Sequence, residues 1–293
     1  MSAGALIVVA PGAQLLVQDA GRPGFGAIGV SASGAADQAA YRAANRLVGN
    51  RPGSAALEAL AAGAMLRAEG AQVIAVTGAA ESVLVHRAGG DTRSEPSWTL
   101  IALGDGDVLE LPRASTLRRV VAVRGGVEVP PVLGSRSRDT LAAIGPEALV
   151  AGDRMPVGDA AGDWPAISFI VPPAIADAPL PLLPGPRRDR LVDERALFGR
   201  QWRVSPASNR TALRLEAAEA PPGVPLPNAD AHGLASEGMV PGALQVPPSG
   251  EPILLLVDHP VTGGYPVPFV LASAALSRAA QLAPGASVRF VLG

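Results

Sequence analysis

Residues 253–266 read Ile-Leu-Leu-Leu-Val-Asp-His-Pro-Val-Thr-Gly-Gly-Tyr-Pro. Five apolar residues followed by a carboxylate, an imidazole and a proline predict a buried strand with polar groups at its rim, because aliphatic residues favour strands and proline ends the ladder. The glycine pair also suits a plain turn that links two strands. The crowding of Asp258, His259, Thr262 and Tyr265 in this one turn favours a functional site.

The composition of the chain favours short strands over long helices. The 293 residues are enough for one large domain or two ordinary ones. Hydrophobic residues make up 48% and aromatic residues 3%, so the core is built from aliphatic side chains, and 34 Gly and 29 Pro supply turns. The expected class is mainly β with a few helices.

The absence of two residue types excludes several chemistries. All 24 basic residues are Arg, so this chain has no Walker A lysine, no Schiff-base lysine and no lysine that carries biotin. No Cys is present, which excludes thiolate nucleophiles, disulfides and Cys-based metal sites, and no metal site is predicted. The net charge of −2 gives no basic footprint for nucleic acid.

No targeting or membrane segment is expected. The apolar run near residue 5 has no basic residues before it and is broken by Pro11. No apolar run approaches the roughly 20 residues that a membrane helix needs. The sequence therefore predicts a soluble, cytoplasmic protein without a membrane partner.

The first half reads as strands around one clear helix. Apolar residues at spacings of three and four predict a helix over 35–48, with Ser33 as N-cap and Gly49 as the C′ glycine. Glu58 lies among apolar residues and needs a cationic partner, for which an arginine is expected. Short strands are predicted at 6–9, 15–17, 73–76, 83–86, 99–103, 108–111 and 120–123, with a closing strand over 151–158.

Two loops of this half carry groups suited to an anion. Asp19 and Arg22 stand three apart among glycines, where they can bind one small anionic or amide ligand or can pair with each other across a turn. In residues 134–140, hydroxyls alternate with guanidinium groups, which suits phosphate or carboxylate oxygens. The alternative for that segment is a solvated basic turn.

The second half is predicted to form another barrel. The proline-rich stretch 165–186 reads as a connection, so we expect one domain over 1–165 and a linker with a second domain over 166–293. Helices are predicted over 189–198 and over 274–281, the latter capped by Ser273. Strands are predicted at 213–215, 244–246, 253–257 and 288–292, and a loose echo between the halves suggests two related β-barrels.

Several motifs together resemble the KipA-type family over nearly the whole chain and in the expected order. Members are described as the C subunit of prokaryotic ATP-dependent 5-oxoprolinase, as allophanate hydrolase subunit 2 or as a biotin-dependent carboxyltransferase. The segments that carry the resemblance are 17–22, 33–37, 44–50, 57–58, 124–126, 132–136, 208–210, 237–242, 245–247 and 262–266. The resemblance implies two cyclophilin-like β-barrels and work in a complex.

Three departures from the family pattern bear on the substrate. Pro260-Val261-Thr262 stands where the family has Gln-Thr-Thr. After Asn-Arg, Thr211-Ala212-Leu213 stands where the family has Met-Gly-Tyr or a similar run, and Arg138 replaces a small hydroxyl residue. The fold implied by the resemblance does not depend on these positions.

The resemblance implies a hydrolase component that helps convert 5-oxoproline to glutamate with ATP. The expected partners are the A and B subunits of 5-oxoprolinase, the latter KipI-like, with a small amide or lactam as substrate and ATP bound by, or shared with, a partner. The alternatives are a carboxyltransferase component of a biotin-dependent urea or amide carboxylase, without biotin on this chain, and a non-enzymatic KipI-binding regulator.

Both enzymatic hypotheses require hydrogen-bond donors that face an amide oxygen, and a group that accepts a proton. The candidates for proton transfer are Asp19, Glu237, Asp258, His259 and Tyr265. The predicted substrate- or anion-binding residues are Arg22, Asn45, Arg124, Ser135, Arg136, Ser137, Ser208, Asn209, Arg210, Gln245, Thr262, Gly263 and Gly264.

Overall fold

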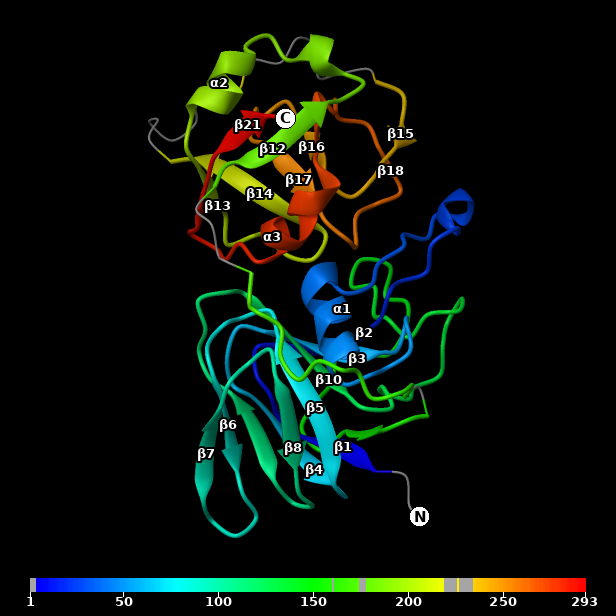
Figure 1. Cartoon of the computed structure of the whole chain (residues 1–293). Helices are drawn as coiled ribbons and strands as arrows, with labels where there is room; N and C mark the ends of the chain where they lie inside the picture. Colours follow the sequence, from blue (N-terminus) through cyan, green and yellow to red (C-terminus); the bar gives the residue numbers. More distant parts are fainter. Residues whose placement is uncertain (1–3, 160, 174–177, 219–225, 227–233) are drawn as a thin grey trace. The chain divides into compact units, whose positions relative to one another are not determined.

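The computed structural model describes residues 4–159, 161–173, 178–218, 226 and 234–293. Their contacts form two compact units (Figure 1). Unit 1 contains Met1–Arg22, Asp37–Asp139 and Ala143–Ala174, and unit 2 contains Pro23–Ala36, Thr140–Ala142 and Ile175–Gly293. The boundary predicted at residue 165 thus falls inside the last segment of unit 1, and two short segments of the N-terminal half belong to unit 2.

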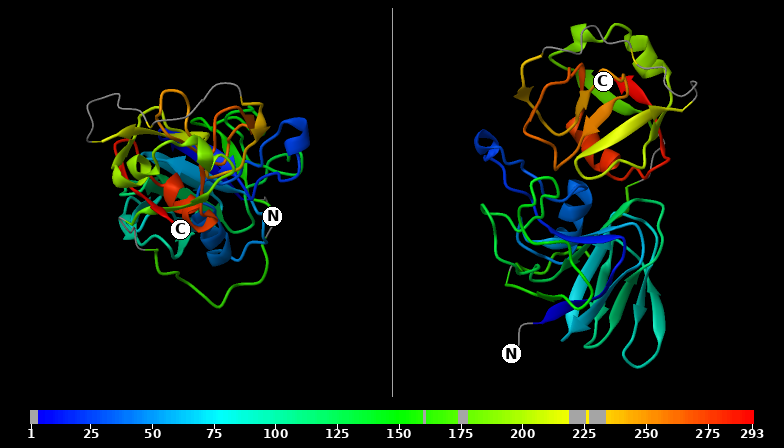
Figure 2. Two further views of the ribbon diagram at one scale, coloured as in Figure 1. Left: turned by 90° about the horizontal axis from the view of Figure 1, so that it is seen from above. Right: turned by 180° about the vertical axis from the view of Figure 1, so that it is seen from behind.

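Unit 1 is built from two antiparallel sheets around one aliphatic core, and the prediction of a mainly β chain is confirmed. The sheets have the orders β11-β1-β4-β9-β6-β7 and β2-β3-β10-β5-β8. Figure 2 shows the strands of this unit from behind. The strands are β1 (Ala5–Pro11), β2 (Gln14–Gln18), β3 (Ala56–Leu60), β4 (Ala64–Glu69), β5 (Gln72–Thr77), β6 (Val83–His86), β7 (Thr92–Glu95), β8 (Leu100–Leu103), β9 (Val108–Leu111), β10 (Arg118–Val123) and β11 (Arg154–Pro156).

Strand β10 is buried along its whole length because both of its faces are covered. Val121 and Val123 point into the core that both sheets share. Helix α1 (Gln38–Leu47) packs on β10 and β5 from the other side (Figure 1). A strand covered on both faces reads as a continuous apolar run, as this one does after its two arginines. The predicted ion partner of Glu58 is Arg118, 3.7 Å away.

The bounds of α1 correct one prediction and confirm another. Its N-cap is Asp37, whose Oδ1 accepts a hydrogen bond from the Ala40 amide at 2.9 Å, so the predicted cap at Ser33 was wrong. Ser33 instead belongs to a segment of unit 2. Gly49 has φ +66°, and a Cβ there would lie 2.6 Å from the Asp163 carbonyl oxygen, so the predicted C′ glycine is confirmed.

Unit 2 is organised on one eight-stranded sheet of order β20-β13-β14-β17-β16-β19-β12-β21, with a separate ribbon of β15 and β18. All pairs are antiparallel except β12 with β21. The strands are β12 (Leu180–Pro184), β13 (Trp202–Val204), β14 (Ala212–Ala217), β15 (Glu237–Gly238), β16 (Ala243–Gln245), β17 (Ile253–Leu255), β18 (Thr262–Gly263), β19 (Phe269–Leu271), β20 (Ser287–Val288) and β21 (Phe290–Leu292).

The helices of unit 2 are shorter than predicted. A turn η2 (Arg188–Arg190) and helix α2 (Glu194–Gly199) replace the single helix expected over 189–198, and Asp193 caps α2. Near the end, η3 (Ser273–Ala275) runs into α3 (Leu276–Ala280) (Figure 1). Ser273 makes no capping hydrogen bond, so that predicted cap was wrong. A further short turn, η1, spans Gly26–Ile28.

Apolar residues cover both faces of the sheet in unit 2. The main core contains Trp202, Leu213, Leu254 and Phe269. A smaller cluster lies on the opposite face and includes Leu255. Along the described residues, no helix combines the length and apolar character needed to cross a membrane.

Candidate functional site

In unit 1, the carboxylate of Asp19 binds the loop of residues 134–140, which was predicted to bind an anion. Its Oδ1 accepts hydrogen bonds from Ser135 Oγ at 2.6 Å and from the Gly21 amide at 2.8 Å. Its Oδ2 accepts from the Arg136 amide at 2.6 Å, and Ser135 Oγ also contacts Ser137 Oγ at 2.7 Å. Asp19 is buried. These residues, which the sequence named in two separate loops, lie in one cluster that is closed by internal hydrogen bonds.

Arg22 and Arg136 have different surroundings in this cluster. Arg22 is 1% exposed, and its guanidinium donates to the carbonyl oxygens of Val132 and Ser137. Arg136 is half-buried and pairs with Glu128 on the surface. Arg22 thus ties the loop to the chain after β2, and Asp19 binds the same loop through its carboxylate.

Asn45 and Arg124 hold the end of α1 to the segments around it. Asn45 Nδ2 donates to the Ser54 carbonyl at 3.2 Å, and its Oδ1 accepts from Asn50 at 2.8 Å. Arg124 donates to the carbonyls of Val48 at 2.9 Å and Gly162 at 2.7 Å. Its guanidinium also lies 3.8 Å from the ring centre of Trp164, a cation–π contact. The described contacts of both side chains are internal to unit 1.

In unit 2, Asp258 forms the most completely paired group among the predicted residues. Arg210 donates to it twice, from Nε to Oδ2 at 2.9 Å and from Nη2 to Oδ1 at 3.2 Å. Ser33 Oγ donates to Oδ1 at 2.7 Å, and Thr140 donates to Oδ2 from its amide at 2.9 Å and its hydroxyl at 2.7 Å. Arg210 also donates to the Gly34 carbonyl at 2.6 Å.

This network explains the charge state of Asp258, which is 0% exposed. Burial alone raises the pKa of the carboxyl group, but the charge of Arg210 and the hydrogen bonds from Arg210, Ser33 and Thr140 outweigh burial and hold the pKa below its ordinary value. The ionised carboxylate fastens Ser33 and Thr140 to the turn after β17, and Arg210 fastens Gly34. Sequence reasoning missed Ser33 and Thr140 because they lie far away along the chain.

His259 follows Asp258 and has a different chemistry. Its Nδ1 lies 2.8 Å from the Pro260 carbonyl oxygen. A carbonyl oxygen only accepts hydrogen bonds, so Nδ1 carries the proton and the Nε2 of neutral His259 keeps its lone pair. No hydrogen bond to Nε2 is formed within the part of the chain that the structure describes.

Glu237, Thr262 and Gly263 meet in the β15–β18 ribbon. Glu237 pairs with Gly263 in the register. Its carboxylate binds Arg187, and this hydrogen bond and the carboxylate charge raise the pKa of Arg187. A Cβ on Gly263 would lie 2.6 Å from Gln245 Nε2, so the glycine allows the ribbon to approach β16 closely.

The remaining predicted residues lie before β14 and in the turn after β18. Ser208 Oγ accepts from the Arg214 amide at 3.0 Å, and Asn209 Oδ1 accepts from the Thr211 amide at 2.8 Å, so both side chains shape the turn into β14. Gly264 is exposed and leads into Tyr265, which is 44% exposed.

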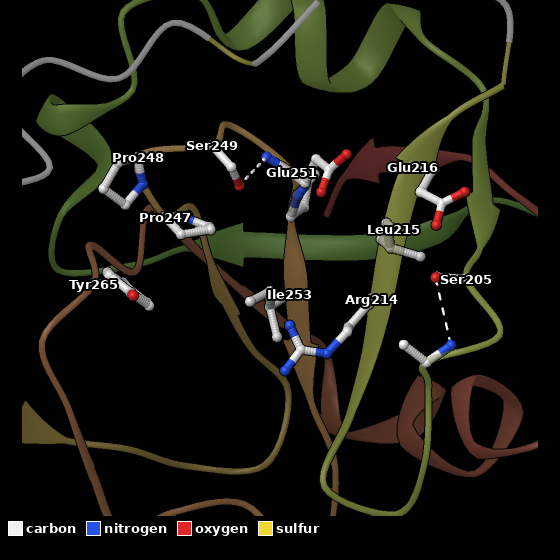
Figure 3. A pocket seen from close by; sticks show the side chains of 12 residues that line it. Ser205, Arg214, Leu215, Glu216, Pro247, Pro248, Ser249, Glu251, Ile253 and Tyr265 are labelled. Carbon is white, nitrogen blue, oxygen red and sulfur yellow. Dashed lines mark hydrogen bonds between the residues drawn. The ribbon is translucent and has the colours of Figure 1, made fainter. Parts of the chain in front are cut away.

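Tyr265 lines an open groove of about 550 Å³ that sequence analysis did not identify (Figure 3). Its other lining residues are Ser205, Ala207, Arg214, Leu215, Glu216, Pro247, Pro248, Ser249, Glu251, Pro252 and Ile253. Arg214 and Glu216 were the missed signal, because charged residues at alternate positions of a strand point to its solvent face. Within the described residues, no three His, Asp or Glu side chains are grouped to hold a metal ion.

Proteins of known sequence are similar to this chain over almost its full length. The chain is 33% identical to the C subunit of 5-oxoprolinase from Escherichia coli (strain K12), over 98% of this chain and 90% of that protein. It is 29% identical to the C subunit of 5-oxoprolinase from Haemophilus influenzae, over 94% of this chain and 86% of that protein. The urea amidolyase of Saccharomyces cerevisiae is 28% identical over 98% of this chain, which corresponds to 16% of the yeast protein.

Solved structures share the fold. The crystal structure of TTHA0988 superposes with a TM-score of 0.84 at 34% identity, covering 99% of this chain and 56% of that one. The urea carboxylase of Kluyveromyces lactis gives a TM-score of 0.83 at 29% identity, covering 98% of this chain and 27% of that one. A family model described as carboxyltransferase domain, subdomain A and B, matches residues 28–292, and this chain belongs to that family.

Proposed function

We propose that this chain is the C subunit of an ATP-dependent 5-oxoprolinase complex. The observation that carries the proposal is the end-to-end match with the Escherichia coli protein of that name, which covers 98% of this chain and 90% of that protein. By contrast, the match with the urea amidolyases covers only 16–17% of those longer proteins. The similarity therefore extends over nearly the whole 5-oxoprolinase subunit but over only one segment of the urea amidolyases.

The proposed reaction opens the lactam ring of 5-oxoproline to glutamate. ATP phosphorylates the lactam oxygen and leaves as ADP, water adds to the carbonyl carbon, and the C–N bond breaks as the nitrogen gains a proton, which leaves an acyl phosphate. A second water hydrolyses the acyl phosphate to glutamate and inorganic phosphate. The step in which water attacks needs a group that removes a proton from it. Among the candidates, His259 has the Nε2 lone pair for this role, whereas the carboxylates of Asp19, Asp258 and Glu237 already accept hydrogen bonds from protein donors.

The partners in this proposal are the A and B subunits of the enzyme, of which the second is KipI-like. ATP is proposed to bind one of these partners or to be shared with it, because this chain has no lysine for a Walker A loop. Arg22 and Arg210 offer little to its phosphates, since their guanidinium groups already bind carbonyl and carboxylate groups of the protein.

The test is coupled turnover with the purified A and B subunits and this chain. Glutamate release and ATP hydrolysis should both require 5-oxoproline and this chain. Normal glutamate release with this chain omitted would overturn the proposal.

The role of His259 is tested with His259→Asn, whose amide can still donate to the Pro260 carbonyl but cannot accept the proton. Turnover should fall by about 10²–10⁴-fold, the usual contribution of a general base, while the complex still assembles. Turnover within threefold of the parent would exclude His259 as the base without bearing on the place of this chain in the complex.

A carboxyltransferase function is the second candidate, and the similarity to urea carboxylase favours it. It predicts carboxyl transfer from a biotinylated carrier to urea or another amide, and therefore dependence on bicarbonate. The same purified complex decides between the two functions: turnover that needs bicarbonate and a biotinylated carrier supports the carboxyltransferase, and ATP-dependent glutamate release without them supports the 5-oxoprolinase.

A further inference from the structure

The groove beside Tyr265 lies on the solvent side of the sheet in unit 2. On this face, the apolar cluster that contains Leu255 and Met239 lies next to the close approach of Gly263 and Gln245. Farther along the same strands, the lining of the groove contains charged and apolar side chains in separate places (Figure 3).

Arg214 supplies a cation without an ion partner among the residues that the structure describes. It is exposed, and no hydrogen bond or ion pair of its guanidinium is formed with any residue that the structure describes. Figure 3 shows the guanidinium directed toward Ile253 and away from Glu216. It therefore remains available for a carboxylate, which guanidinium groups bind through paired hydrogen bonds.

Two carboxylates stand at another part of the groove. Arg214 pairs with Ile253 in the register of β14 and β17, and the Leu215 amide donates to the Pro252 carbonyl. Continuing this antiparallel register places Glu216 opposite Glu251. Like charges directly opposite one another are destabilising in a sheet, so this pair favours a cation between its members.

The walls between the charged groups are apolar. Tyr265 and Pro247 stand on one side of the groove, and Ile253 lies at its floor (Figure 3). About 550 Å³ exceeds the volume that a single ion needs and falls in the range of small-molecule sites. Along β14, the Cα atoms of Arg214 and Glu216 are about 6.6 Å apart at 3.3 Å per residue, so their side chains can reach the two ends of one small molecule.

We propose that this groove binds a free α-amino acid with an apolar side chain. The carboxylate of the ligand binds Arg214, the ammonium group lies at Glu216 and Glu251, and the side chain packs on Tyr265 and Pro247. The groove carries one positive and two negative charges, so a neutral zwitterion fits better than an acidic amino acid. This inference does not depend on the proposed function, because 5-oxoproline has no ammonium group.

The test is isothermal titration of the full chain with L-leucine, N-acetyl-L-leucine, L-leucinamide, L-glutamate and 5-oxoproline. L-leucine should bind, and loss of either its ammonium or its carboxylate group should weaken binding at least tenfold. L-glutamate should bind more weakly than L-leucine, and 5-oxoproline should not compete with it.

Variants locate the binding. Arg214→Gln should weaken L-leucine binding at least tenfold. The double variant with Glu216→Gln and Glu251→Gln should weaken it by a similar factor. Arg289→Gln is the matched control, since Arg289 is an exposed arginine of the same unit that does not line the groove. Absence of L-leucine binding, or equal binding by the Arg214→Gln and Arg289→Gln variants, would overturn the proposal.

Discussion

Replacing Asp258 by Asn should destabilise unit 2 strongly. The change leaves the guanidinium of Arg210, which is 3% exposed, without its counter-charge, and it weakens the hydrogen bonds from Ser33 and Thr140. Removing one member of a buried ion pair costs about 3–5 kcal/mol, because the remaining charge stays buried. At about 2–4 °C per kcal/mol, the melting temperature should fall by on the order of 10 °C.

The assay combines urea unfolding with hydrogen exchange. Because Asp258 fastens Ser33 and Thr140, exchange should rise in the segments 23–36 and 140–142 of the Asp258→Asn variant. The exposed pair of Arg154 and Glu69 provides the control, and Glu69→Gln should have a much smaller effect because solvent screens both charges. A further variant that combines Asp258→Leu with Arg210→Met should lose less stability than Asp258→Asn, since it leaves no lone buried charge.

The same pair gives a defined pH dependence. The pKa of Asp258 is lower in the folded chain than its ordinary value of about 3.9, so the network contributes its full stability above that value. This contribution is lost as the pH falls through the folded pKa. The stability difference between the parent and Asp258→Asn should therefore be constant near neutral pH and shrink below about pH 4. A parent chain whose free energy of unfolding lies within about 1 kcal/mol of the variant at pH 7 would refute the reasoning.

Three other changes test single contacts of unit 1 by denaturant unfolding. Gly125→Ala should lower the free energy of unfolding by about 1–3 kcal/mol more than the control Gly53→Ala. Both glycines have positive φ, but only at Gly125 would a Cβ clash with the Gly158 carbonyl oxygen, so equal losses would contradict this clash. Asp19→Ala should cost about 2–4 kcal/mol, since three donors lose their acceptor, and an effect no larger than that of the exposed control Asp91→Ala would argue against it. Arg119→Met should leave stability unchanged or raise it, because burial lowers the pKa of Arg119 and no described residue accepts a hydrogen bond from its guanidinium; a loss above about 2 kcal/mol would show that the charge is needed.

Much of the fold follows from local patterns. The strands at 73–76, 83–86 and 120–123 were predicted within a residue or two. Alternating or continuous apolar runs between Gly-rich turns show directly which side chains of a strand are buried. The cap of α1 was misplaced because Ser33 and Asp37 are both good N-caps, and only the tertiary bond of Ser33 to Asp258 decides between them.

The membership of the two units was not predictable by the same means. Residues 23–36 are rich in Gly, but a Gly-rich loop does not show which unit it belongs to. Both this segment and residues 140–142 join unit 2 through contacts more than 100 residues away in sequence. Asp19, Ser135, Arg136 and Ser137 were named as candidates from residue type, but residue type alone did not show that they lie together or that internal donors already occupy the carboxylate of Asp19.

The turn that follows β17 illustrates why crowded polar residues in a sequence need not share one task. Asp258 is fully buried and bound by five hydrogen bonds, so its carboxylate is committed to holding distant segments. His259 keeps a lone pair on Nε2 because Nδ1 faces its neighbour's carbonyl oxygen. Tyr265 is exposed at the groove. If the turn takes part in catalysis, His259→Asn should therefore lower turnover while leaving stability nearly intact, and Asp258→Asn should lower stability first.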